Sequence, residues 1–296
     1  INYVLYPCKG GMAVRSNRKW WKIGLLLVLA GVMLLVRYKG ILYTGVHPVM
    51  TYVESQRISD GTEDYKQLEN GRFVVRYKAG DREAADRVET IAAAWGSKVL
   101  DYFGYQPSDP IDIIIFSREE DLKGVLRIPH GQSATGAYAG GMINLLSPDS
   151  LKGMNQDPDS LVNVFVHELA HLAMDGICRG NYPLWFAEGS ALYMEYVLLG
   201  YEWGSGLPEE PNYTMEDLTY RFHALDDQKA YRQSFLLVKG LADRYGKDSC
   251  MEFLHRLGSG QDFEKALRDG FGIQSVTDIR DWRSMASGKS RCRAWI

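Results

Sequence analysis

The chain has 296 residues, 46% of them hydrophobic and 24% charged, a composition typical of a globular protein with one large domain or two modest ones. The formal net charge of −3 hides an asymmetry: residues 1–40 hold seven Lys or Arg side chains and no acid, whereas the remainder carries an excess of ten acidic residues. An acidic body without a basic stripe argues against nucleic acid as a partner.

The basic N-terminal segment surrounds an uncharged run of fourteen residues, Ile23–Val36. As a helix this run covers about 21 Å, less than the ~30 Å hydrocarbon core of a bilayer. Flanking aromatic residues, with snorkelling by Lys22 and Arg37, bring it close to spanning length. We predict a signal anchor at 23–38 and a cytoplasmic basic tail at 1–22, with the rest of the chain outside the cell. A cleaved signal peptide is the alternative.

Residues 39–70 are polar and weakly patterned, which predicts a linker that leaves the membrane. We expect a single domain at 71–296. Its first strand is predicted at 71–77 by an alternating, β-rich sequence. Apolar spacing at 81–103 predicts a helix, and the apolar run at 111–116 predicts a buried strand.

Residues 136–147 combine a glycine-rich turn with a third predicted strand. The glycines indicate either close approach by another backbone or a simple hairpin turn. After Ser147 the pattern becomes helical, with helices predicted at 158–176, 183–200, 230–246 and 248–258. The fold class is therefore α+β, a small mixed sheet with helices followed by a mainly helical C-terminal half.

The four cysteines are far apart and lack a CxxC spacing, which excludes a zinc knuckle or a redox motif. They are Cys8, Cys178, Cys250 and Cys292. An extracytoplasmic body would permit one disulfide among the last three, and the spacing does not select the pair.

The stretch VFVHELAHLAMDG, residues 164–176, carries the clearest chemical pattern. On a helix, His167 and His171 lie one turn apart on one face, close enough to hold a single ion. Glu168 projects toward the same mouth, where it can take a proton from an activated water. The alternative is a pair of histidines packed in a core helix. Because the apolar surroundings bury this helix, a His–Glu–His cluster without a counter-ion would cost much desolvation energy, which favours the metal.

A catalytic zinc site has three protein ligands and one open position. Glu188 follows His171 by seventeen residues and lies on the next predicted helix, which is otherwise apolar for two turns. An inward carboxylate there needs a positive partner, so we predict that Glu188 is the third ligand of one zinc ion per chain. A solvent-facing charge is the alternative.

HELAH followed by a helix that contains WFAEGSA resembles the gluzincin zinc metallopeptidases, the group of thermolysin and the zinc aminopeptidases. The chain is most similar to their compact peptidase MA-like members. The resemblance covers residues 70–285 in the order of elements, and its specific motifs are confined to 167–171 and 185–191.

The resemblance implies two histidines and a downstream glutamate as zinc ligands and the HExxH glutamate as general base: His167, His171, Glu188 and Glu168. It also implies a Tyr or His that stabilises the oxyanion of the tetrahedral intermediate. Tyr231 is the candidate for this role, and His223 is the reserve.

Members of the group also have an edge strand that runs antiparallel to the substrate, and residues 139–146 would occupy it. This chain has GGMIN where the aminopeptidases have GxMEN, so the resemblance does not imply recognition of a free amino terminus. Leu192 replaces the carboxylate that thermolysin-like enzymes carry one turn after the third ligand. Asp175 or Glu195 could orient a ligand instead.

The sequence thus predicts a membrane-anchored, extracytoplasmic zinc metallopeptidase that acts on a peptide or protein. The alternatives are a membrane-tethered zinc-binding module without turnover and a zinc hydrolase of a non-peptide substrate, such as an ester or a cell-wall component. The intact Glu168 favours an enzyme. Cleavage specificity and oligomeric state are not indicated.

Overall fold

The computed structural model describes residues 39–128, 134–154, 157–207 and 213–275, together with parts of 21–31. By contacts the chain divides into two units, 1–39 and 40–296. In the first unit, the described residues are helical, and most of the predicted anchor and tail lies outside the described residues. Within the described ranges, one helix is long and apolar enough to cross a membrane, Leu161–Cys178, and 67% of it is buried in the protein, as in a core helix.

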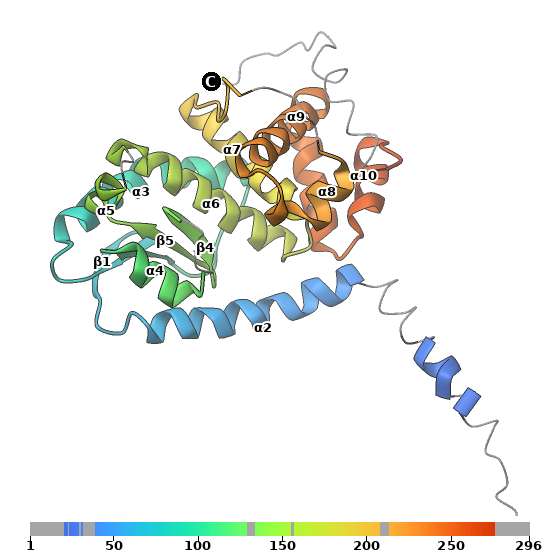
Figure 1. Cartoon of the computed structure of the whole chain (residues 1–296), viewed down its shortest axis with the longest axis horizontal. Helices are drawn as coiled ribbons and strands as arrows, with labels where there is room; N and C mark the ends of the chain where they lie inside the picture. Colours follow the sequence, from blue (N-terminus) through green and yellow to red (C-terminus); the bar gives the residue numbers. More distant parts are fainter. Residues whose placement is uncertain are drawn as a thin grey trace, which may run out of the picture. The chain divides into compact units, whose positions relative to one another are not determined.

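The second unit contains a five-stranded mixed sheet (Figure 1). Its strands are β1 (Lys66–Asn70), β2 (Phe73–Tyr77), β3 (Ile111–Phe116), β4 (Gly136–Ala139) and β5 (Met142–Leu146). They lie in the order β1-β2-β3-β5-β4. The three central strands are parallel, and the two edge strands run antiparallel to their neighbours. The predicted α+β class and small mixed sheet are confirmed.

The glycines of the β4–β5 hairpin serve both purposes considered for them, a tight turn and close approach by another backbone. Gly140 and Gly141 have φ values of 59° and 75° and form the turn. A Cβ on Gly140 would lie 2.8 Å from the backbone nitrogen of Ser55, so this turn also contacts another backbone closely. The expectation that 139–146 forms the edge strand is wrong, because β5 pairs with both β3 and β4. Every residue of β5 is buried, as expected of a strand covered on both faces, and β4 forms the edge.

The segment 39–70 differs from the linker that its polarity predicts. It contains α2 (Lys39–Asp60) and β1, and the compact unit begins at Gly40. The side of α2 that faces the domain is small and polar, with Thr44 buried and the Glu54 carboxylate accepting a hydrogen bond from the Gly140 N–H at 3.2 Å. A packed helix is normally recognised in a sequence by an apolar stripe that faces the core, and α2 lacks such a stripe on the side that faces the domain.

The helices outside the sheet are α3 (Arg82–Phe103), α4 (Glu119–Leu126), α5 (Pro148–Gly153), α6 (Leu161–Cys178), α7 (Leu184–Leu199), α8 (Met215–Tyr220), α9 (Asp227–Gly258) and α10 (Phe263–Phe271), with 3-10 turns at Pro158–Ser160 and Phe222–Ala224. The two helices predicted at 230–246 and 248–258 are the two parts of α9, which is broken at Gly246 (φ 81°). α6 continues two residues past the predicted stop at Gly176. A Cβ there would overlap the ring of Tyr105, so this glycine permits close packing and does not end the helix.

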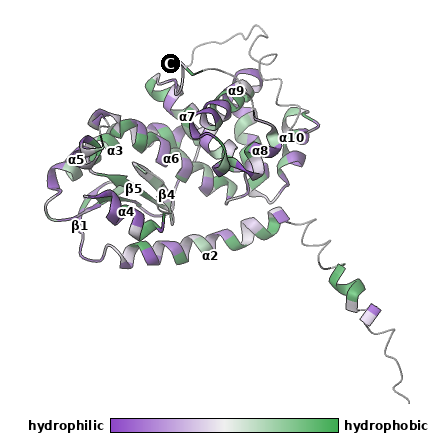
Figure 2. Cartoon of the chain, viewed as in Figure 1, coloured by the Kyte–Doolittle hydropathy of each residue, from purple (hydrophilic) through white to green (hydrophobic). Residues whose placement is uncertain are grey.

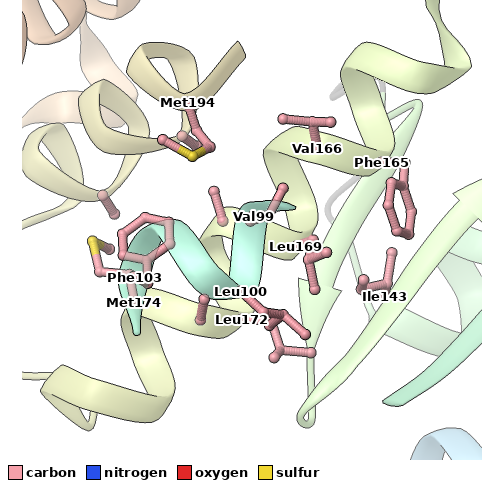
Figure 3. Close-up of a cluster of buried hydrophobic side chains, with 14 of the residues drawn as sticks. Val99, Leu100, Phe103, Ile143, Phe165, Val166, Leu169, Leu172, Met174 and Met194 are labelled. Atoms are coloured by element: carbon pink, nitrogen blue, oxygen red, sulfur yellow. The ribbon is translucent and has the colours of Figure 1, made fainter. Parts of the chain in front are cut away.

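α6 lies between the sheet and the helical C-terminal half, and it is buried on most sides. Its apolar side chains pack with α3, β5 and α7 in one cluster (Figure 3), in which Val99, Phe165, Leu169 and Met194 are at most 1% exposed. Cys178 and Cys250, two of the three cysteines considered for a disulfide, are free thiols. The third, Cys292, lies outside the described residues. A rigid, buried α6 gives its polar residues fixed positions.

Candidate metal centre and active-site cleft

Three side chains predicted as zinc ligands converge in the second unit. Nε2 of His167 and Nε2 of His171 are 3.1 Å apart. Oε2 of Glu188 lies 3.3 Å from the former and 3.6 Å from the latter. Between 12% and 15% of each side chain is exposed, so the three donor atoms face a common point that solvent reaches only partly.

Helix packing explains the convergence. His167 and His171 are separated by one turn of α6, and α7 packs against α6 and carries Glu188. Gly189 follows Glu188, and a Cβ there would overlap the backbone carbonyl of Ser234 on α9. α7 is therefore held between α6 and α9 at a distance that only glycine allows.

Glu195 orients His167 from the opposite side of its ring. Its Oε1 lies 2.8 Å from Nδ1 of His167, and its Oε2 accepts a hydrogen bond from the amide of Asn163 at 3.1 Å. Glu195 is 4% exposed and lies two helical turns beyond Glu188. A carboxylate on Nδ1 fixes the tautomer that leaves Nε2 free to bind a metal. Of the two residues that sequence offered for this role, Glu195 contacts a ligand.

The electrostatics of this cluster favour a cation. Burial raises the pKa of the Glu188 carboxyl, but the two imidazoles lower it more, and its pKa lies well below the usual range. Burial lowers the pKa of His167, but hydrogen bonds with Glu188 and Glu195 raise it well above its usual value. Three carboxylates thus surround two imidazoles in a shielded place. Two imidazole nitrogens and one carboxylate oxygen are a donor set that fits zinc.

Glu168 lies beside the ligands and contacts the sheet edge. It is 7% exposed, and its Oε2 accepts a hydrogen bond from the backbone N–H of Tyr138 on β4 at 2.7 Å. Burial raises the pKa of Glu168, although the neighbouring histidines oppose this. A carboxylate with a raised pKa is a better proton acceptor for catalysis near neutral pH.

The edge of β4 also presents its own backbone groups. The Thr135 carbonyl accepts a hydrogen bond from Leu146 on β5. Because these groups alternate along an antiparallel strand, those of Gly136 and Tyr138 point away from β5. Gly136 lines a cleft of about 930 Å³ that also includes His167 and Glu168. Because the Tyr138 N–H is taken by Glu168, the outward groups left for an extended peptide are those of Gly136 and the Tyr138 carbonyl.

Tyr231 lines the same cleft from the first turns of α9. Burial raises the pKa of its hydroxyl far above the usual range, and the charges of Glu188, Asp227 and Glu168 add to this. The rings of Trp203 and Phe222 hold the phenol at centroid distances of 5.9 and 5.5 Å. His223 is exposed and is not part of the cleft lining. The structure therefore brings Tyr231, and not His223, to the metal ligands.

Asp175 is a residue whose role sequence reasoning missed. It is 3% exposed and its carboxylate accepts hydrogen bonds from the Tyr138 hydroxyl at 2.6 Å, the Tyr182 hydroxyl at 2.7 Å and the Gly180 N–H at 3.0 Å. Nε2 of His47 on α2 lies 2.9 Å away. Only its place one turn after His171 is visible in the sequence, because its partners come from distant segments.

The sequence of residues 93–288 matches the family profile described as Peptidase MA superfamily. The chain belongs to the peptidase MA superfamily. The resemblance to the gluzincin, peptidase MA-like group is thereby confirmed, and the match covers α6, α7 and every candidate ligand.

Other relatives of this peptidase MA chain cover parts of it. The uncharacterised protein YhcO of Bacillus subtilis (strain 168) is 28% identical over 180 residues, which are 56% of this chain and 54% of that protein. A mutant M1 zinc metallopeptidase from Deinococcus radiodurans has a TM-score of 0.43 at 16% identity, with 73% of this chain and 50% of that chain covered. A mutant two-domain M1 zinc metallopeptidase bound to L-arginine gives 0.45 at 15% identity, with 74% and 51% covered. This chain spans about half the length of each.

Proposed function

We propose that the protein is a zinc-dependent peptidase that hydrolyses peptide bonds in a peptide or protein substrate. One observation carries the proposal: Nε2 of His167, Nε2 of His171 and Oε2 of Glu188 lie 3.1–3.6 Å from one another, with Glu168 beside them in the cleft. Membership of the peptidase MA superfamily supports it.

The side chains divide the chemistry among them. Zinc held by the three ligands supplies Lewis-acid activation of water and of the scissile carbonyl. Glu168 accepts the proton of the attacking water and returns it to the leaving amine. The Tyr231 hydroxyl donates a hydrogen bond to the developing oxyanion. The substrate backbone pairs with the outward groups of Gly136 and with the Tyr138 carbonyl on β4, while the Tyr138 N–H stays on Glu168.

The position of Glu168 supports turnover over a binding-only role. A module that only binds zinc needs the ligands but has no use for the additional buried carboxylate of Glu168, which costs desolvation energy. Here that carboxylate is held by the Tyr138 N–H on the edge where a peptide would pair. The same arrangement favours an extended peptide over a compact ester.

We also propose that residues 23–38 anchor the chain in the cell membrane as a single span, with the N-terminus in the cytoplasm and the catalytic domain outside. The apolar run Ile23–Val36 and the basic residues that precede it support this topology. Reporter fusions at both ends of the chain test it. The topology would be overturned if a reporter of the kind that works only outside the cytoplasm were active when fused to the N-terminus.

Zinc content and peptide cleavage of the purified full chain test the proposed activity, with Glu168→Gln as the decisive variant. We expect about one zinc per chain in both proteins, because Glu168 is not a ligand, and a cleavage rate lower by about 10²–10⁴-fold in the variant. Glu252→Gln, at an exposed carboxylate on α9, is the matched control and should leave both values unchanged. Wild-type protein without zinc refutes the proposal, and zinc-loaded protein that cleaves no peptide supports the binding module.

A further inference from the structure

Helix α2 has its polar side turned toward the protein. Gly40 and Thr44 are buried and His47 and Thr51 are half-buried, and His47 and Glu54 make the contacts to Asp175 and Gly140 described above. The opposite side is apolar, and 46–63% of each large side chain on it is exposed. This α2 apolar face consists of Ile41, Leu42, Tyr43, Val46, Val49, Met50, Tyr52 and Val53.

The rest of the domain surface does not share this property. Eleven large apolar side chains are exposed in the described residues of 40–275, and eight of them belong to the α2 apolar face. The others, Val197, Tyr201 and Tyr220, lie on separate segments. Hydrophobic residues recur along α2 in Figure 2, and no charged residue stands between Lys39 and Glu54. A contiguous exposed apolar patch marks a surface that another apolar phase covers.

The covalent chain indicates which phase this is. Only two residues, Arg37 and Tyr38, separate the apolar run Ile23–Val36 from the start of α2 at Lys39, and the three steps from Val36 to Lys39 reach at most about 11 Å. If the run enters a bilayer, as proposed above, the first turn of α2 starts at the bilayer surface. Charge agrees on the same side of the bilayer, because the basic residues between the run and Glu54 are Arg37 and Lys39 and no acid stands there, which suits anionic headgroups.

The composition of the face fits a bilayer interface. Tyr43 and Tyr52 combine a ring with a hydroxyl, as do the residues that gather at headgroup level, and aliphatic side chains fill the positions between them. We propose that the α2 apolar face lies in the interface of a phospholipid bilayer and binds the domain to the membrane surface. The inference rests on the proposed anchor, but it is independent of the proposed peptidase activity.

Site-specific photo-crosslinking of the full chain tests this surface. p-Benzoylphenylalanine replaces Tyr52 on α2 or, as the matched control, Tyr220 on α8, which is 78% exposed and lies away from α2. The protein is reconstituted into vesicles of phosphatidylethanolamine and phosphatidylglycerol and irradiated. Mass spectrometry should find lipid adducts at position 52 about ten times as often as at position 220.

Other products would overturn the proposal. Equal lipid labelling at both positions means that α2 does not touch the bilayer, and crosslinks from position 52 to a second copy of the chain mean that the face is a dimer interface. Absence of any adduct at position 52 means that the face is in water. Peptide cleavage measured on the same vesicles reports the proposed activity separately, so failure of one idea is distinguishable from failure of the other.

A second variant excludes a folding artefact. Val49→Gln and Val53→Gln together should lower the lipid adducts at position 52 several-fold and leave the thermal unfolding midpoint unchanged, because both side chains point away from the domain and are about 60% exposed. Unchanged adducts would contradict the proposal. A lowered midpoint would do so as well, since it would show that these residues pack against protein.

Discussion

Tyr138 and Glu168 are joined by a 2.7 Å hydrogen bond from the backbone of the sheet edge to the candidate catalytic base. The hydroxyl of Tyr138 in turn donates to Asp175, one turn beyond His171 on α6. One residue of β4 thus links the sheet edge, the candidate base and the helix that carries the two candidate histidine ligands. The position of the base is a property of the sheet as well as of the HExxH helix.

Replacing Glu195 by Gln should weaken zinc binding. The variant keeps the size of the side chain but removes the negative charge that holds Nδ1 of His167 at 2.8 Å. Loss of such an outer partner typically costs about 10–100-fold in metal affinity. A competitive chelator titration measures the change, with Glu252→Gln as the surface control. Unaltered affinity would show that His167 needs no support from Glu195.

Tyr231→Phe should keep zinc and lose turnover. The hydroxyl borders the ligands, and removal of one oxyanion donor typically lowers kcat by about 10²–10³-fold. His223→Ala should leave kcat within about two-fold, because His223 is exposed and does not line the cleft. Steady-state kinetics on zinc-saturated protein measures both. If kcat fell more in His223→Ala than in Tyr231→Phe, His223 and not Tyr231 would be the oxyanion donor.

Asp175→Asn should destabilise the protein in a pH-dependent way. Burial raises the pKa of Asp175, but hydrogen bonds from His47, Tyr138 and Tyr182 lower it more, and the net pKa is below its ordinary value of 3.8. A depressed folded-state pKa gives stability that is present above the unfolded-state pKa and is lost as pH falls through the folded-state pKa. We expect a loss of about 1–3 kcal/mol at pH 7.

Denaturant unfolding of wild type and variant at pH 7 and at pH 3 checks this prediction. The difference between them should shrink at pH 3, which lies below the ordinary carboxyl pKa of 3.8, because the unfolded wild type has by then taken up a proton that the folded carboxylate resists. Asp149→Asn, at a side chain that is 94% exposed, should change neither value. A difference that stays equal at both pH values would mean that the Asp175 charge contributes nothing.

Gly189→Ala should disturb the third ligand without touching it. The new Cβ overlaps the Ser234 carbonyl, so α7 must move away from α9 and carry Glu188 with it. Overpacking of this kind typically costs about 1–3 kcal/mol, and zinc affinity should fall with it. Gly153→Ala, which adds a Cβ in open space on α5, is the control. Unchanged unfolding free energy and zinc affinity in Gly189→Ala would refute the packing argument.

The sequence predicts best what is local. His167, Glu168 and His171 are fixed by helical spacing, and the buried strand at 111–116 is recognised from its apolar residues, which only Asp112 interrupts. Glu188 follows from its isolation on an apolar helix. All of these depend on neighbours within a few turns, where backbone geometry determines which side chains share a face.

The features that the sequence did not predict depend on distant partners. The sequence offered both Asp175 and Glu195 for the orienting role without choosing between them. Glu195 takes it because two turns of α7 return it to His167, whereas Asp175 contacts His47, Tyr138 and Tyr182. The edge strand is β4 because β5 pairs on both sides. α2 escaped detection because its apolar side faces away from the domain.

The most direct test of the central claim is X-ray absorption spectroscopy at the zinc edge on the purified full chain and on His171→Ala. We predict about one zinc per wild-type chain, with imidazole nitrogens at about 2.0–2.1 Å and a carboxylate oxygen at about 2.0–2.2 Å, and loss of one imidazole contribution in the variant. A zinc signal without imidazole scattering, or one unaltered by His171→Ala, would contradict the assignment of His167, His171 and Glu188 as the metal centre.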